Sequence, residues 1–178
     1  MSTGILCDYE IETAVNVGNV VIRPYSPDNV QPNSYDIHLG KEIVVMYPGD
    51  SPEKKKLPYT LKHGEFILGT TAEYIEIKKS CCAELSGKST CARYGISVHQ
   101  TGGWIDCGFK GNITLEIVNN GHDYELVSGM PIGQLIFHTC QNPRYAYGER
   151  GNHYQGQEGV TLPWDYTTED KPLKKSKK

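Results

Sequence analysis

The sequence predicts an all-β fold, a sandwich or barrel of short strands with few helices. The chain contains 19 glycines and 10 prolines among its 178 residues, a composition that favours turns over long helices. After about residue 65, short runs rich in β-branched and aromatic residues alternate with Gly, Asn and Asp turns. Regularly repeated short strands are typical of sandwiches and barrels. The length fits one domain with a sizeable core.

The N-terminal third predicts a helix followed by short strands. Apolar residues recur at helical spacing in residues 4–16, which indicates a short helix. Residues 19–23, 34–39 and 42–46 are apolar or alternating runs of strand length. Residues 47–60 contain three prolines and a lysine run, so we expect a polar loop with a solvent-exposed tip.

The remainder predicts further strands with one helical interruption. Residues 89–94 break the alternation, and we expect a single helical turn there. Periodicity ends near residue 142, and residues 166–178 are basic at their end; we expect a disordered tail rather than a targeting or nucleic-acid signal. The predicted strands are residues 65–71, 74–79, 81–86, 95–99, 112–120, 124–129 and 132–139.

Charge and composition exclude several classes of protein. The formal net charge is −3, so global electrostatics give no reason to expect nucleic-acid binding. No apolar run approaches the roughly 20 residues of a membrane span, and the N-terminus lacks the pattern of a signal peptide. We therefore expect a cytoplasmic protein with reduced thiols. Its six cysteines are Cys7, Cys81, Cys82, Cys91, Cys107 and Cys140.

Residues 87–90 (GKST) are similar to the end of a phosphate-binding P-loop. The first glycine of that motif would fall at Cys82, and no parallel strand–helix–strand pattern surrounds it, so the P-loop is rejected. A weaker anion site remains, made by Lys88 and N–H groups that open a helical turn; an ordinary capped turn is the alternative. Ser89 and Arg93 are spaced i, i+4 and share one face of that turn. They form either a clamp for a carboxylate or a surface hydrogen bond.

Two acids are candidates for catalysis. Asp106 lies in a glycine-bounded turn, where it is either a turn former, a base or an acceptor for a sugar hydroxyl. Glu116 lies in a strand whose alternation places Leu115 and Ile117 on one face and Glu116 on the other. A glutamate on that face is either solvated or enclosed in a pocket, where it can move protons.

Five motifs follow one another along the chain. They are residues 87–93 (GKSTCAR), 99–111 (HQTGGWIDCGFKG), 112–118 (NITLEIV), 129–135 (GMPIGQL) and 153–163 (HYQGQEGVTLP). In this order they resemble the dCTP deaminase family of the dUTPase-like superfamily. Its corresponding motifs are G-R-S-S-L-A-R, H-x-T-A-G-x-I-D-x-G-F-x-G, the strand with the catalytic Glu, G-M-x-I-G-Q-L and the C-terminal lid. The likeness covers roughly residues 1–165 and is clearest from Gly87 onward.

The resemblance implies a homotrimer of distorted jelly-roll subunits, a β-clip barrel of the dUTPase-like type, with active sites between subunits. One domain would span residues 1–165, and its C-terminal lid would be residues 142–165, approximately. The ligands would be small molecules, with dCTP and dUTP as substrates and dTTP as a feedback inhibitor. Neither a nucleic acid nor a membrane is expected as a partner.

Four residues would carry the catalysis if the resemblance holds. Glu116 would be general base and then general acid: it takes a proton from the water that attacks C4 of cytosine, then delivers protons to N3 and the departing ammonia. Ser89 would hold that water, and Arg93 would orient Glu116. Asp106 would bind the 3′-hydroxyl or activate a water for attack on phosphate.

Other residues would hold the nucleotide. Lys88, Ser89 and Thr90 would bind the phosphates, with Mg²⁺ bound through the phosphates rather than by protein ligands. Phe109 would pack under the deoxyribose and exclude a 2′-hydroxyl, and residues of the lid would close over the triphosphate. The expected substrate-binding residues are Lys88, Thr90, Thr101, Gly102, Phe109, Gln134, Tyr147, His153 and Gln157.

Zinc is not expected, although zinc-dependent cytidine deaminases are well known. Their signature is H-x-E followed by P-C-x-x-C. Residues 63–65 (HGE) match its first half, but the chain has no C-x-x-C. The side chains of the adjacent Cys81 and Cys82 point apart on a strand, so ligand spacing is missing as well.

Three positions depart from the family pattern. Lys88 replaces Arg and loses its bidentate phosphate contact. Gly102 replaces an Ala whose backbone carbonyl holds the water in the family, and glycine loosens that loop. His153 replaces the lid Lys, so phosphate binding there would depend on pH. The class is unaffected, but substrate affinity and inhibition by dTTP depend on these positions.

The resemblance extends to a bifunctional branch that continues to dUMP and pyrophosphate. Gly103 and Phe109 follow that branch, whereas the single-step branch more often has a basic pair before Ile-Asp and a Trp after the glycine. We therefore expect two reactions. The alternatives are a monofunctional deaminase that releases dUTP, a plain dUTPase, against which Glu116 and Arg93 argue, and a non-catalytic nucleotide-binding trimer.

Overall fold

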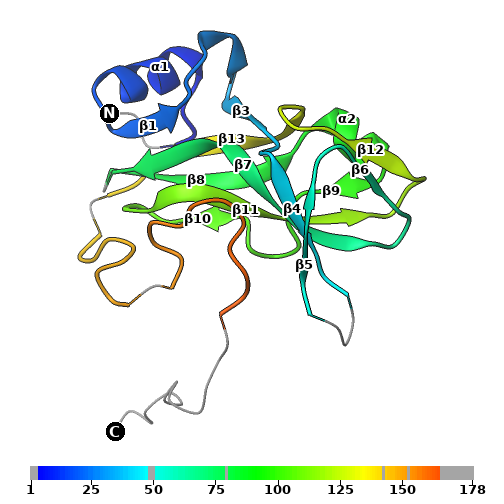
Figure 1. Cartoon of the computed structure of the whole chain (residues 1–178). Helices are drawn as coiled ribbons and strands as arrows, with labels where there is room; N and C mark the ends of the chain where they lie inside the picture. Colours follow the sequence, from blue (N-terminus) through cyan, green and yellow to red (C-terminus); the bar gives the residue numbers. More distant parts are fainter. Residues whose placement is uncertain (1–3, 48–50, 79, 142, 152, 165–178) are drawn as a thin grey trace, which may run out of the picture.

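A computed structural model describes residues 4–47, 51–78, 80–141, 143–151 and 153–164, and within them it is mostly β-structure with few helices (Figure 1). In chain order the elements are α1 (Asp8–Asn16), β1 (Val20–Arg23), the 3-10 helix η1 (Pro27–Asn29), β2 (Val30–Gln31), β3 (Ser34–His38), β4 (Glu42–Val45), β5 (Glu53–Lys56), β6 (Tyr59–Leu61), β7 (Phe66–Ile77), β8 (Cys81–Gly87), α2 (Ser89–Arg93), β9 (Ile96–Ser97), β10 (Trp104–Ile105), β11 (Lys110–Asn119), β12 (Tyr124–Leu126) and β13 (Pro131–Thr139).

Two antiparallel sheets and a short ribbon make up the architecture. The larger sheet has the order β5-β4-β7-β11-β9, and β1 also pairs with β7. The smaller sheet has the order β10-β8-β13-β3-β2, and β12 pairs with β6 as a separate ribbon. Neighbours in each sheet come from distant parts of the sequence, as in the pairing of β13 with both β3 and β8. Non-local pairing of this kind is typical of sandwiches and barrels.

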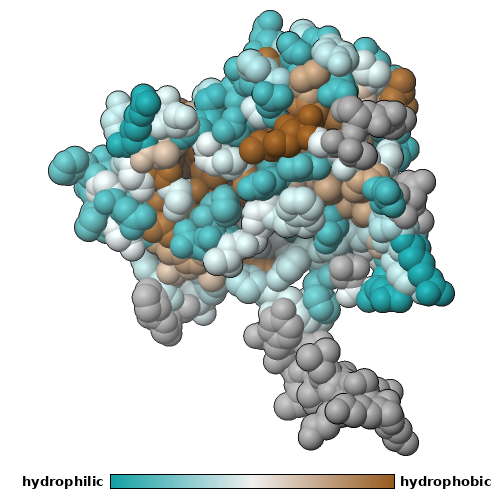
Figure 2. Space-filling model, turned by 180° about the vertical axis from the view of Figure 1, so that it is seen from behind, coloured by the Kyte–Doolittle hydropathy of each residue, from teal (hydrophilic) through white to brown (hydrophobic). Residues whose placement is uncertain are grey.

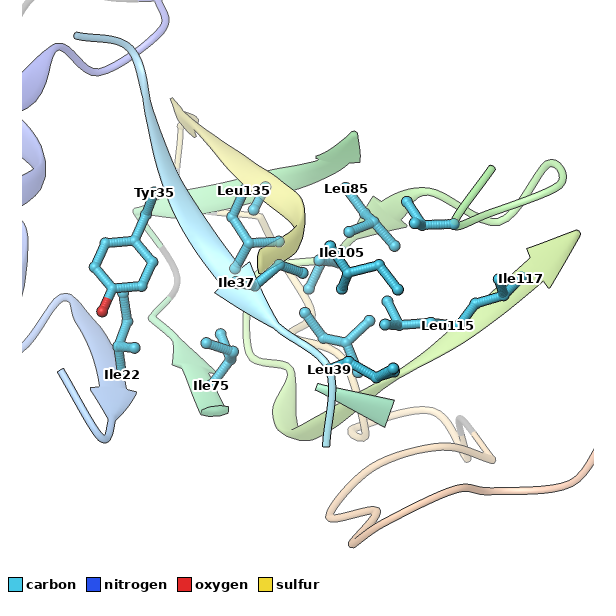
Figure 3. Packing of buried hydrophobic residues seen from close by; sticks show 14 of the residues in the cluster. Ile22, Tyr35, Ile37, Leu39, Ile75, Leu85, Ile105, Leu115, Ile117 and Leu135 are labelled. Atoms are coloured by element: carbon cyan, nitrogen blue, oxygen red, sulfur yellow. The ribbon is translucent and has the colours of Figure 1, made fainter. Parts of the chain in front are cut away.

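The core lies between the two sheets because apolar side chains alternate along the strands. In β11 the odd-numbered residues are buried, while Glu116 is half-buried on the opposite face, as the alternation predicts. Figure 3 shows Leu85 and Leu135 of the smaller sheet directed toward the same interior as Leu115 and Ile117 of the larger one. Burying each such side chain stabilises the fold by roughly 1.5–3 kcal/mol. The strand that carries Glu116 is therefore firmly fixed.

Most predicted elements are confirmed. The N-terminal helix is α1, and the helical turn at residues 89–94 is α2. The separate runs at 65–71 and 74–79 are one strand, β7, with an irregularity in its register with β11 between Asn112 and Thr114. The irregular part of β7 lies between the two predicted runs, so one strand was predicted as two. Cys91 of α2 is buried in the core.

Within the polar loop expected at residues 47–60, Glu53–Lys56 form β5, which extends the larger sheet by pairing with β4, and Lys54 donates to Glu42 across the pair at 3.1 Å. Charged lysine side chains on an edge strand discourage a further strand from pairing with it. Residues 48–50 lie outside the described residues. The two-residue strands β2 and β10 were missed because they are too short to show periodicity.

Helix α2 and the C-terminal segment, which comprises the described residues 143–151 and 153–164, lie at different ends of the molecule. Figure 1 shows α2 at the upper right, whereas the C-terminal segment, in orange, lies at the lower left beneath β10 and β11. The predicted basic tail, residues 166–178, lies outside the described residues. This separation matters because residues from both regions were predicted to share one active site.

Apolar side chains of the described residues are scattered over the face opposite to that of Figure 1. Figure 2 shows apolar side chains there in areas divided by hydrophilic ones. Scattered apolar residues are normal on a protein surface. No helix within the described ranges is long and apolar enough to cross a bilayer.

Candidate active site

A pocket of about 290 Å³ opens between β11, the turn after β10 and the C-terminal segment. Its size suits a small organic ligand. Apolar and aromatic side chains supply most of its lining, and two carboxylates, Asp106 and Glu116, lie among them. The lining residues are Leu68, Gly102, Trp104, Ile105, Asp106, Phe109, Ile113, Thr114, Glu116, Tyr147, Tyr154, Gln157, Thr161, Leu162 and Pro163.

Glu116 is held in one orientation by the loop that follows β9. The backbone N–H of Gln100 donates to its Oε2 at 2.8 Å, and its own N–H donates to the carbonyl of Val98 at 3.0 Å. The other carboxylate oxygen, Oε1, faces Gly102, where a Cβ would stand only 3.2 Å away. A half-buried carboxylate with one oxygen fixed and one next to the pocket is placed to exchange protons with a ligand or a water.

The turn from Asp106 to Phe109 forms a second wall of the pocket. The N–H of Phe109 donates to the carbonyl of Asp106 at 3.2 Å, which closes the turn and leaves the Asp106 carboxylate exposed. Gly108 has a φ of +91°, and a Cβ there would lie 2.6 Å from the Cβ of Ala146. Glycine is therefore required for the C-terminal segment to approach the turn.

Tyr147 joins this turn to the C-terminal segment. Its N–H donates to the carbonyl of Cys107 at 2.8 Å, and its ring lies 5.9 Å from that of Phe109. Burial, and to a smaller degree the Asp106 carboxylate, raise the pKa of the Tyr147 phenol. The raised pKa keeps this phenol protonated to a higher pH than that of an exposed tyrosine.

The predicted lid residues behave differently from one another. Gln157 lines the pocket, and its Nε2 donates to the carbonyl of Asn112 at 2.6 Å. His153 is not among the lining residues; its ring stacks on Trp164 with centroids 4.1 Å apart. The hydroxyl of Tyr154 accepts from the N–H of Trp164 at 3.0 Å and also lines the pocket. Residues 153–164 thus carry their own internal contacts as well as pocket residues.

The predicted phosphate-binding residues line a second pocket, between β2, β3 and the start of α2. Lys88 there forms an ion pair with Asp36, which is 8% exposed. Gln134 accepts from the hydroxyl of Ser34 at 2.8 Å and donates to the carbonyl of Gly87 at 3.2 Å. The lining residues are Gln31, Pro32, Asn33, Ser34, Asp36, Lys88, Ser89, Thr90 and Gln134.

Ser89 and Arg93 do not meet Glu116 within one chain. Both lie exposed on α2, and neither lines the pocket that contains Glu116. The two pockets share no lining residue within the described part of the chain. One chain therefore presents two separate groups of predicted site residues: the Glu116 half-site, defined by the first pocket, and the Lys88 half-site, defined by the second pocket together with Arg93. Thr101 is exposed beside Gly102 and lines neither pocket.

Sequence reasoning missed several residues of these pockets, Asp36 and Trp104 among them. Asp36 is a buried acid in a strand with apolar neighbours, and its place between Tyr35 and Ile37 is the signal that could have identified it. Trp104 is 56% exposed, an unusual degree for so large an aromatic side chain. The C-terminal residues Thr161, Leu162 and Pro163 also line the pocket, but a segment without periodicity offers no comparable signal.

Comparison with known proteins identifies one family over most of the chain. A family model described as dCTP deaminase-like matches residues 5–140. A "dCTP deaminase, dUMP-forming" of Methanosphaerula palustris is 38% identical over 174 residues, which cover 89% of this chain and 94% of that protein. One of the same description from Bifidobacterium longum is 37% identical over 182 residues, which cover 91% and 94%.

A solved structure supports the fold. The crystal structure of 2′-deoxycytidine 5′-triphosphate deaminase from Agrobacterium tumefaciens superposes with a TM-score of 0.67 at 20% identity. The match covers 79% of this chain and 49% of the crystallised one, so this chain spans about half the length of that protein. At this identity the likeness concerns the arrangement of strands alone.

Proposed function

This chain belongs to the dCTP deaminase-like family, and from that membership we propose that it converts dCTP and water into dUMP, ammonia and pyrophosphate. Two relatives described as "dCTP deaminase, dUMP-forming" are 38% and 37% identical over about nine-tenths of the chain. The observation that carries the proposal is Glu116, a carboxylate fixed by the Gln100 N–H at the wall of a ligand-sized pocket.

Deamination replaces the C4 amino group of cytosine by oxygen. Glu116 takes a proton from a water, whose oxygen bonds to C4 while N3 receives a proton. The C4–N4 bond then breaks, and a second proton transfer through Glu116 lets the nitrogen leave as ammonia. A single carboxylate that alternates between base and acid suffices, because each proton it accepts is passed on. Proton transfer by a positioned group typically contributes 10²–10⁴-fold to a rate.

No Ser, Lys or Arg among the described residues lines the Glu116 pocket, so the water and the developing charge at C4 need further partners. We propose that Ser89 and Arg93 of a neighbouring subunit supply them. Both side chains are exposed on α2 and lie outside the Glu116 pocket of their own chain. A hydroxyl and a guanidinium on one helical face can hold a water and orient a carboxylate. This arrangement requires an oligomer, and we propose the homotrimer of jelly-roll subunits.

The triphosphate is proposed to lie at the Lys88 half-site. Lys88, Ser89 and Thr90 line one pocket, and an ion pair with Asp36 holds the Lys88 side chain there. Hydroxyls and a cation beside the first turn of a helix are typical of phosphate sites. The lid would close over the phosphates from the C-terminal side, with His153 giving up its stacking on Trp164.

Mg²⁺ is proposed to accompany the nucleotide and to neutralise its phosphate charge. Within the described residues no three or more His, Cys, Asp or Glu side chains are grouped to hold a metal ion. The buried Asp36 Oδ1 has no hydrogen-bond partner within the described ranges and lies beside Lys88, so it fits a water bound to a phosphate-held Mg²⁺. No zinc is proposed, since the zinc-deaminase signature is missing from the sequence.

The second reaction is proposed to use Asp106. A water activated by its exposed carboxylate would attack the α-phosphorus of dUTP, and the bond from that phosphorus to the bridging oxygen would break, so that pyrophosphate leaves. Phe109 and Tyr147 form the neighbouring wall and would hold the deoxyribose by packing. A buried ring at Phe109 leaves little room for a 2′-hydroxyl. We place these reactions in the cytosol, where thiols stay reduced.

Product analysis tests the proposal. The protein is incubated with dCTP and Mg²⁺, with and without a zinc chelator, and nucleotides are separated by ion-exchange chromatography. We expect dUMP and pyrophosphate in equal amounts, unaffected by the chelator. Accumulation of dUTP would reduce the function to deamination alone. Hydrolysis of dUTP with dCTP untouched would leave a dUTPase and remove the role of Glu116, and no turnover of either would leave a nucleotide-binding trimer.

A further inference from the structure

Asn112 lies where β11, β7 and the C-terminal segment meet. The register between β11 and β7 shifts at this residue, between Asn112 and Thr114. A register shift leaves backbone groups of the longer strand without ladder partners. The same residue is adjacent to the bridge between Gly111 and Gln157, which brings the C-terminal segment onto β11.

The side-chain amide of Asn112 connects two segments. Its Nδ2 donates to the carbonyls of Thr71 at 3.2 Å and Glu73 at 3.1 Å, both in the irregular part of β7. Its Oδ1 accepts from the N–H of Gly159 at 3.3 Å. Both ends of the amide are therefore used, one for the sheet and one for the C-terminal segment.

The backbone of Asn112 adds two more contacts to the same segment. Its N–H donates to the carbonyl of Gln157 at 3.0 Å, and its carbonyl accepts from Gln157 Nε2 at 2.6 Å. Two residues beyond Asn112 and four beyond Gln157, the N–H of Thr161 donates to the hydroxyl of Thr114 at 3.2 Å. Gln157 and Thr161 both line the Glu116 pocket.

We propose that Asn112 is a positioning residue that holds residues 155–161 of the C-terminal segment over the nucleotide. It acts through Gln157 and Thr161 and touches no reacting atom. The inference rests on the proposed function in one respect, since the nucleotide is taken to occupy the Glu116 pocket. Because its amide is fixed by two carbonyls of β7, Oδ1 is oriented before the segment arrives, and little freedom is lost on docking.

Asn112→Ala in the full-length chain tests this inference, with Asn120→Ala as the matched control. Asn120 is exposed just beyond the other end of β11 and lines a different pocket. Hydrogen exchange in the absence of nucleotide is followed at the amides of Gly159 and Thr161, and at the β11–β7 ladder. We expect about tenfold faster exchange in the C-terminal segment of Asn112→Ala, with an unchanged ladder and an unchanged control.

Steady-state kinetics supply the second readout. We expect Asn112→Ala to raise the KM for dCTP about tenfold with kcat changed by less than about threefold, since docking contributes to binding before and during the reaction. Equal acceleration of exchange in the ladder and the segment would make Asn112 a support of β7 and overturn the inference. Unchanged exchange in both would also overturn it. If the wild type did not convert dCTP, the proposed function would fail, while the exchange result would still decide the role of Asn112.

Discussion

At the scale of single residues, Glu116 carries the strongest prediction. Replacing it by Gln keeps the oxygen that accepts from the Gln100 N–H but removes the group that moves protons. We expect deamination of dCTP to fall by about 10²–10⁴-fold. Hydrolysis of dUTP should persist, because Asp106 stands in a different wall of the pocket. Separate assays with dCTP and dUTP as substrates measure the two effects.

The exposed carboxylate of Glu125 on β12 provides a control for this substitution. Glu125→Gln makes the same chemical change outside both pockets and should leave both activities unchanged. Equal losses of deamination and dUTP hydrolysis in Glu116→Gln would show a damaged pocket instead of a missing proton carrier. Unchanged deamination would remove Glu116 from the mechanism.

Buried thiols predict how stability depends on pH. Burial, with a smaller contribution from Cys140, raises the pKa of Cys82 to about 12, and burial also raises the pKa of Cys81, Cys91 and Cys107. The unfolded chain releases these protons near pH 9 and the folded chain does not. Their contribution to stability is therefore complete below pH 9 and is lost as the pH rises toward 12.

We expect the melting temperature to fall by on the order of 5 °C across that range, as measured by circular dichroism. Cys82→Ala should flatten the decline, because it removes a thiol whose pKa is raised to about 12. A melting temperature that did not change between pH 9 and 11, or a slope that Cys82→Ala did not alter, would contradict this account.

At the scale of elements, the turn that ends α2 depends on a glycine. Gly95 has a φ of +83°, and a Cβ on it would lie 2.4 Å from the backbone nitrogen of Gly121. Gly95→Ala should therefore destabilise the fold by about 2–4 kcal/mol, through strain and through displacement of the neighbouring backbone. Chemical denaturation measures the loss.

Gly18 separates the two causes. Its φ is +72°, but no atom lies within 4 Å of a Cβ built there, so Gly18→Ala incurs the conformational cost without a clash. We expect a loss of about 1 kcal/mol. If Gly95→Ala cost no more than Gly18→Ala, the contact with Gly121 would not be rigid. Because α2 carries Ser89 and Arg93, Gly95→Ala should also lower activity beyond its effect on stability.

The elements also show what the sequence could predict. Alternation fixed the face of β11 on which Glu116 lies, because a strand has a period of two and its apolar face must be buried. It failed for β5, where lysines on an edge strand carry no apolar pattern. It also failed for the C-terminal segment, whose place depends on contacts with Asn112 and Cys107 that are distant in sequence. Local pattern predicts elements, whereas docking of a segment depends on its partner.

At the scale of the whole molecule, the candidate residues divide into two half-sites. The motifs identified all of these residues, but spacing alone did not say which of them share a pocket. Glu116, Asp106 and Phe109 meet the C-terminal segment, whereas Lys88, Ser89 and Gln134 meet β3. One sequence motif, residues 87–93, thus supplies a surface away from the pocket that it is proposed to complete. The proposed homotrimer would bring the two together at a subunit boundary.

Mixed trimers test this directly. Glu116→Gln removes one half-site and Ser89→Ala removes the other, so each variant alone should be inactive in deamination. In a trimer assembled at random from equal amounts of both, a complete site forms where an intact Glu116 half-site meets an intact Ser89 half-site. This combination occurs in about a quarter of the interfaces, so about a quarter of wild-type turnover should return. Activity that stayed at the level of the separate variants, after confirmed mixing by mass spectrometry, would mean that each chain forms its own site and that α2 must move toward β11. Recovery near a quarter would instead place the reaction at the subunit boundary, since no chain in such a mixture holds both intact groups.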